Sequence, residues 1–200
     1  MKVLFWRANR RARRGDFQQA IELYSSILKI AGVPLVLRLR GIALGTLGRH
    51  EEAISDFDEG LALDPRFTLC YLERGVAKSE RGDVSGALED FEAALRLEPS
   101  NYSAIVSIAW MKRKLGAAAE AFAGFEGAAK LKPELGEAWA GMGLIEFDRK
   151  ALESAARYAK KAIALGGLDK ELKVELAKIK PMEECAHRID PSTLPNGPHL

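Results

Sequence analysis

The chain has 200 residues, of which 48% are hydrophobic, so it is long enough to bury a substantial core in one or two domains. Its net charge is +2, which gives no reason to expect a polyanionic partner for the whole chain, although the first 40 residues carry nine basic and two acidic side chains. Two widely separated cysteines argue against a disulfide framework, and no run of about 20 apolar residues suggests a membrane span.

A short pattern recurs about every 34 residues along the chain. Its landmarks are Gly15, Gly48, Gly82, Gly116 and Lys150, with spacings of 33, 34, 34 and 34 residues. An alanine follows five residues after each landmark, and an aromatic residue follows four residues later in every copy but the last. Seven residues before each landmark stands glycine or alanine, and a proline ends each of the three middle copies. Such a period indicates an array of one structural unit.

Each copy is predicted to be a helical hairpin. The landmark glycine can adopt a positive φ and end the first helix, and small residues such as Gly75 and Ala87 let two antiparallel helices approach closely. The aromatic residue, Phe91 in the third copy, is expected to fill the gap toward the next hairpin, and Pro99 ends the second helix. One hairpin cannot bury its apolar face alone, so we expect the units to stack.

In chain order, the sequence predicts an array over residues 1–167 and a capping helix over 168–180. The hairpins are predicted at 1–33, 34–67, 68–101, 102–135 and 136–167. The apolar stripe of the capping helix consists of Leu168, Leu172, Leu176 and Ile179, and Asp169 is its predicted N-cap. Residues 181–200 are expected to form a short helical turn and a disordered tail.

The pattern resembles the tetratricopeptide repeat, whose signature is Trp-x2-Leu-Gly followed by Ala-x3-Phe and Pro. The matching residues are Trp139, Met142, Gly143, Ala53, Phe57, Ala87, Phe91, Pro65 and Pro99. The resemblance covers residues 1 to about 167 and implies an all-α fold, a right-handed superhelix of about five hairpins plus the capping helix. The end copies depart from the signature, with Arg7 and Arg11 in the first and Lys150, Ala159 and Gly167 in the last, as end copies of arrays commonly do.

Residues for catalysis are not recognisable in the sequence. The histidines, His50, His187 and His199, lie in a predicted turn or in the tail, and they form neither a Ser/Cys/His set nor a zinc motif. Cys185 and His187 fall short of the four ligands of a structural zinc site. We therefore expect no enzyme activity, no cofactor and no metal.

A basic stripe marks the first predicted helix. Arg7, Arg10, Arg11 and Arg14 follow the spacing i, i+3, i+4, i+7 and share one helical face. This face could contact an acidic protein, an anionic membrane or nucleic acid, or it could be a charged cap that keeps an end face in water. Base-stacking aromatic residues are not interleaved with the stripe, so we favour the charged cap.

The binding site favoured by the sequence is a groove. In the family, the first helices of successive hairpins line a concave surface, and several of these helices carry a second apolar stripe that packing within one hairpin does not require. The predicted groove residues are Phe5, Asn9, Arg38, Ile42, Leu72, Val76, Glu80, Val106, Trp110, Arg113, Leu144 and Phe147. The alternative is that some of them pack against neighbouring helices.

One subtype of the family has characteristic binding residues that can be compared with this sequence. Tetratricopeptide proteins that capture the C-terminal carboxylate of heat-shock chaperones share Lys, Asn and Arg residues from three consecutive copies. Here Asn9 matches, but the partner positions hold Phe5, Leu39, Leu69 and Glu73, so this clamp is not expected. An apolar groove instead suits an amphipathic helix or an extended apolar peptide.

We therefore expect a non-catalytic scaffold or adaptor that binds a peptide or helix of another protein. The alternatives are a holding chaperone for apolar segments of a secreted or membrane-inserting partner, and docking on an acidic surface through the Arg7–Arg14 face. Nucleic acid is not expected as a partner. Because Leu4, Phe5 and Trp6 are followed at once by Arg7, no secretory signal is predicted, and a cytoplasmic location is expected.

Overall fold

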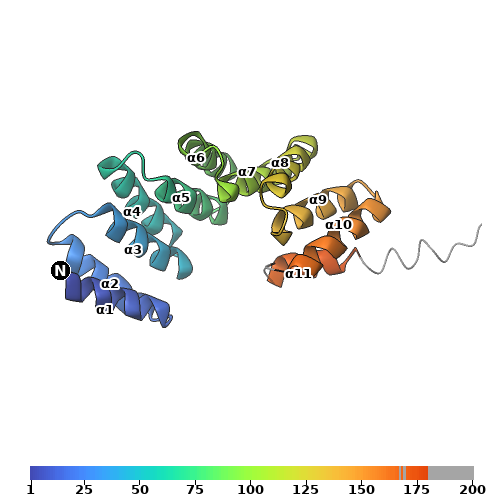
Figure 1. The fold of residues 1–200 in the computed structure, drawn as a ribbon. Coiled ribbons are helices and arrows are strands. Elements are labelled where there is room, and N and C mark those ends of the chain that lie inside the picture. The colour runs from blue at the N-terminus through green and yellow to red at the C-terminus, as the bar shows by residue number, and fades with distance from the viewer. Residues whose placement is uncertain (167, 169, 180–200) are drawn as a thin grey trace, which may run out of the picture. The chain divides into compact units, whose positions relative to one another are not determined.

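The computed structural model describes residues 1–166, 168 and 170–179, and within these ranges every regular element is an α-helix (Figure 1). The helices are α1 (Lys2–Arg13), α2 (Phe17–Leu28), α3 (Pro34–Thr46), α4 (His50–Leu63), α5 (Thr68–Glu80), α6 (Val84–Leu97), α7 (Tyr102–Lys114), α8 (Ala118–Leu131), α9 (Gly136–Asp148), α10 (Leu152–Leu165) and α11 (Lys170–Ala177). None of the described helices is long and apolar enough to cross a membrane.

The chain divides into two compact units, Met1–Leu115 and Gly116–Leu200. In the first unit, α1 packs on α2, α3 on α4 and α5 on α6, and each pair also contacts the next helix in the chain. In the second unit, α9 packs on both α8 and α10. The predicted all-α architecture of helical hairpins is confirmed. The division falls in the turn of the fourth predicted hairpin rather than between two hairpins.

The landmark residues sit in the turns between paired helices. Their φ angles are +82° at Gly15, +75° at Gly48, +91° at Gly82, +79° at Gly116 and +63° at Lys150. The predicted positive φ of the turn glycines is therefore confirmed. The last copy keeps the same backbone conformation although a lysine, which pays a steric cost in this region, replaces the glycine.

The second helix of each middle hairpin ends before its proline, as predicted. Helices α4, α6 and α8 end two residues before Pro65, Pro99 and Pro133. Proline cannot continue the hydrogen-bond pattern, and it disfavours helical backbone at the residue before it.

In the second and third copies the aromatic residue lies in the core, against the glycine of the first helix. A Cβ placed on Gly75 would lie 2.7 Å from the Phe91 ring, and one on Gly41 would lie 2.6 Å from the Phe57 ring. Gly75 therefore makes room for the Phe91 ring. Phe91 also shares a buried cluster with Met111 of α7, in the next copy.

Helix α11 lies within the predicted capping segment 168–180 and packs on α9. Leu168, Leu176 and Ile179 are buried there, in keeping with the predicted apolar stripe. The predicted N-cap Asp169, the Leu172 side chain and the predicted turn and tail over 181–200 lie outside the described residues.

Candidate functional site

The predicted groove residues differ widely in exposure. Val76 and Glu80 of α5 are exposed, whereas Val106 of α7 and Leu144 of α9 are 2% and 3% exposed and belong to the core. The others are partly buried: Phe5, Asn9, Arg38, Ile42, Leu72, Trp110, Arg113 and Phe147. Leu144 and Phe147 lie in the second unit and the rest in the first. The groove stays a prediction, and its exposed residues, Val76 and Glu80, lie in the first unit.

On α1, the predicted groove residues Phe5 and Asn9 contact side chains within the first hairpin. Phe5 packs against the buried cluster that contains Tyr24. The Tyr24 hydroxyl donates a hydrogen bond of 2.6 Å to the Asn9 side-chain oxygen. The one residue that matched the carboxylate clamp therefore has a partner on α2.

On α5, one apolar stripe is open. Leu69 is 43% and Val76 is 47% exposed, and the two lie two helical turns apart on the same face. Leu72 is partly buried and packs against the cluster of Phe91. Exposed large apolar side chains that line up on one face are a feature of interaction surfaces.

A cavity of about 150 Å³ opens beside Val76, between α3, α4 and α5. Its lining includes Ile42 and Thr46 of α3, His50 and Phe57 of α4, and Glu73, Val76 and Glu80 of α5. We call this cavity the α3–α5 pocket. It brings together three of the predicted groove residues, Ile42, Val76 and Glu80. Gly41 and Gly45 contribute no side chains to the α3 wall of the pocket.

The charged groups of the pocket are two carboxylates. Glu73 pairs with Arg38 at 2.9 Å, from an Arg38 nitrogen to a Glu73 oxygen. Glu80 makes no hydrogen bond or ion pair with the described residues. Sequence reasoning placed His50 in a turn, but it is the first residue of α4, and its Nδ1 is buried without a partner in the described chain. The pocket therefore combines an apolar floor with one exposed, uncompensated negative charge.

Trp110 of α7 contacts a buried cluster and a neighbouring arginine. It packs against the cluster formed by Ala87, Phe91 and Met111. The Arg113 guanidinium lies over its ring, 5.8 Å from the centroid. The side chain was predicted to line the groove, and part of its surface packs within the first unit instead.

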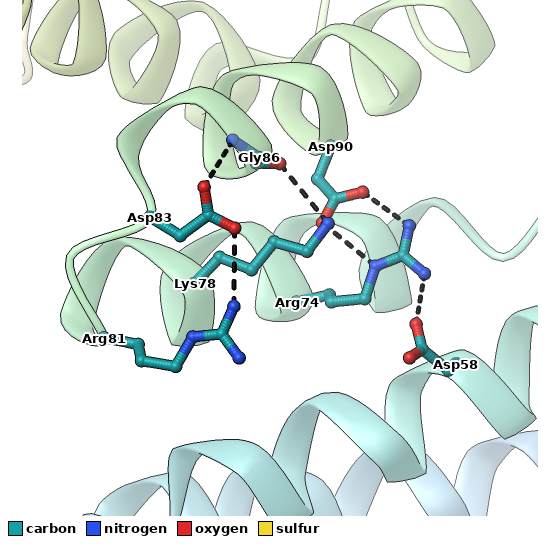
Figure 2. A network of polar contacts seen from close by, with 7 residues as sticks. All are labelled: Asp58, Arg74, Lys78, Arg81, Asp83, Gly86 and Asp90. Carbon is teal, nitrogen blue, oxygen red and sulfur yellow. Dashed lines mark hydrogen bonds and ion pairs between the residues drawn. The ribbon is translucent and has the colours of Figure 1, made fainter.

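An ion-pair network, which sequence reasoning missed, joins the hairpins of the first unit (Figure 2). Figure 2 shows the Arg74 guanidinium of α5 between Asp90 of α6 and Asp58 of α4, with Lys78 also on Asp90. Burial opposes the charge of Arg74, but its hydrogen bonds to Asp90 and Asp58 outweigh this effect and raise its pKa. Arg74 thus ties its own hairpin to the preceding one.

The previous copy repeats this arrangement. Arg40 donates to Asp56 at 2.8 and 2.6 Å and to the Ser25 hydroxyl of α2 at 3.0 Å. Its hydrogen bond to Asp56 raises the pKa of Arg40. The signal was available in the sequence, since an arginine eight residues before the landmark and an aspartate eight residues after it occur in the second and third copies.

The arginine stripe of α1 is largely open to solvent. Arg7, Arg10 and Arg14 are exposed, and Arg11 pairs with Asp16 at 3.1 Å. The Arg10 guanidinium lies over the exposed ring of Trp6, 5.3 Å from its centroid.

The described residues contain no group of three or more His, Cys, Asp or Glu side chains that could hold a metal ion. The predicted partial set at Cys185 and His187 lies outside the described residues. Cys70 of α5 is buried, and burial raises the pKa of its thiol to about 11, which keeps it protonated and unreactive near neutral pH.

Solved structures with the same fold cover most of the chain. PilF of Pseudomonas aeruginosa aligns with a TM-score of 0.75 at 17% identity, over 93% of this chain and 86% of its own. MamA of Desulfovibrio magneticus RS-1 aligns with a TM-score of 0.74 at 22% identity, over 82% and 93%. The first TPR of Spaghetti (RPAP3), bound to an HSP90 peptide, aligns with a TM-score of 0.56 at 27% identity, over 57% and 91%. No curated protein matches by sequence.

A family profile described as tetratricopeptide repeat matches residues 6–66 and 72–135, the segments that carry α1 to α8 almost completely. Because these segments make up more than half of the sequence, the chain belongs to the tetratricopeptide repeat family, whose members are in general non-catalytic scaffolds for protein–protein interaction.

Proposed function

We propose that the protein binds a peptide or amphipathic helix of another protein on the face of α3 and α5, in and around the α3–α5 pocket. The observation that carries the proposal is the open apolar stripe of α5, Leu69 and Val76, beside a cavity that also contains Ile42. An apolar stripe that its own hairpin does not cover is the feature that helix-in-groove recognition uses.

The size of the pocket fits this mode of binding. Apolar cavities of about 150 Å³ hold one benzene ring, so the α3–α5 pocket has room for one aliphatic or aromatic side chain. A peptide would therefore gain most of its affinity from one or two anchors and from the area around them. The peptide-bound relative, Spaghetti, supports a peptide ligand by analogy only, because the clamp residues expected for a carboxylate are absent here.

The test is affinity capture from native extract with the wild-type chain and with Val76→Asp. Val76 is exposed, so the substitution should leave the helical content unchanged, which circular dichroism checks. Glu89→Lys, on the exposed side of α6, is the matched control. Partners retained by Glu89→Lys and lost by Val76→Asp support the proposal, and partners retained by all three chains contradict it.

A holding chaperone would use the same face, and its partner would be insoluble when produced alone, whereas an adaptor's partner would be soluble. Docking of the α1 face on an acidic surface is a second candidate, supported by the exposed Arg7, Arg10 and Trp6. It predicts binding that weakens steeply with salt. Binding left untouched by Arg7→Glu together with Arg10→Glu would contradict it.

A further inference from the structure

We infer that the α3–α5 pocket selects a basic partner, a segment with one apolar anchor and a lysine or arginine about one helical turn away. The inference rests on the proposed function and adds the chemistry of the ligand. The charge of the pocket is opposite in sign to that of the α1 face.

The carboxylates of the pocket are not equally available. Glu73 is held by Arg38, whose guanidinium lies 2.9 Å away, so its charge is largely compensated. Glu80 is exposed and has no hydrogen-bond or ion-pair partner among the described residues. No lysine or arginine lines the pocket, and His50 is its only other titratable side chain. A ligand carboxylate would meet repulsion there, whereas a ligand cation could pair with Glu80.

The spacing of the two exposed residues fixes the pattern that a ligand would need. Val76 and Glu80 are four residues apart on α5, which places them about 6 Å apart along the helix axis and on the same face. A partner helix that runs along α5 with an apolar residue over Val76 would place a residue three or four positions away over Glu80. A basic residue at that position satisfies the carboxylate.

The general charge around the pocket must be separated from the charge of Glu80 itself. Residues 41–98 carry six basic and 13 acidic side chains, so a nonspecific field there would also attract a basic peptide. Glu80→Lys and Glu89→Lys change this field equally, and only the first removes the carboxylate of the pocket.

The experiment uses two fluorescein-labelled helical peptides of about sixteen residues, long enough to form a helix. Both carry one leucine stripe and differ only in the residues that flank it, which are lysine in one peptide and glutamate in the other. Fluorescence anisotropy with the whole protein measures both affinities at low and at physiological salt. We expect the lysine peptide to bind about fivefold more tightly, which corresponds to about 1 kcal/mol, with a smaller ratio at higher salt.

Three variants test which side chains cause the preference for the lysine peptide. Glu80→Lys should abolish or reverse the preference, Glu89→Lys on α6 should leave it unchanged, and Val76→Asn, which adds no charge, should weaken both peptides. Equal binding of the two peptides, still sensitive to Val76→Asn, would overturn the inference and leave the proposed function standing. Binding insensitive to Val76→Asn, or no binding of either peptide, would contradict both.

Discussion

Replacing Asp90 with asparagine should destabilise the first unit more than the same replacement at Asp56 or at Asp58. The Asp90 side chain is 4% exposed and faces two cations, with Arg74 Nε at 2.9 Å and Lys78 Nζ at 2.8 Å. Asparagine keeps the size of the side chain, so no cavity forms and the loss reports the charge. Removing one member of a buried ion pair costs about 3–5 kcal/mol. Both cations are 18% exposed and Arg74 keeps Asp58, so we expect about 2–3 kcal/mol.

Two other aspartates of the first unit, Asp56 and Asp58, differ from Asp90 in burial and in the number of cations they pair with. Asp56 is 6% exposed but pairs with one cation, Arg40, so Asp56→Asn should cost about 1–2 kcal/mol. Asp58 is 55% exposed, and Asp58→Asn should cost less than about 1 kcal/mol. Urea denaturation followed by circular dichroism gives the free energies of unfolding. If Asp58→Asn costs as much as Asp90→Asn, burial does not set the strength of these pairs and the reasoning fails.

Further predictions concern the core. Phe91→Ala removes a ring that is 2% exposed and should lower the free energy of unfolding by about 3–5 kcal/mol. Phe17→Ala, at a partly buried position, should lower it less. Equal shifts of the denaturation midpoint would contradict the central placement of Phe91. Gly41→Ala should destabilise the protein by about 1–3 kcal/mol, because the new Cβ would lie 2.6 Å from a carbon of the Phe57 ring. At Gly45 the new Cβ would lie 4.0 Å from the nearest atom, so Gly45→Ala should stabilise α3 by about 0.5–1 kcal/mol. Thermal unfolding measures both effects. Cys70, whose buried thiol has its pKa raised to about 11, should react with iodoacetamide at pH 8 only after the chain is unfolded, and fast alkylation of the native protein would show that it is accessible.

The features predicted best were those that backbone geometry imposes. A turn between two antiparallel helices needs a residue with positive φ, and a glycine at a fixed spacing identifies it, as at Gly82. The same register located the turn at Lys150, where the glycine is missing. The prolines likewise placed the ends of α4, α6 and α8, because proline is incompatible with the interior of a helix.

The site was harder to predict, because an apolar stripe does not reveal what covers it. Val76 and Trp110 occupy the same register in successive copies, yet Val76 is 47% exposed and Trp110 is partly buried. The hydrogen bond between Asn9 and Tyr24 was not predicted. Tyr24 occupies the aromatic core position of its copy, and the sequence does not show that its hydroxyl needs a partner. The Arg40–Asp56 pair could have been found by asking which polar residues repeat, as well as which apolar ones do.

Photo-crosslinking on the face of α3 and α5 shows directly whether a partner binds there. The protein carries p-benzoylphenylalanine at position 76 in one sample and at position 89, on the exposed side of α6, in the other, and both are irradiated in native extract. We expect defined adducts from position 76, whose crosslinked peptides contain apolar and basic residues, and none of these adducts from position 89. Identical adducts from both positions, or adducts from position 89 alone, would contradict it.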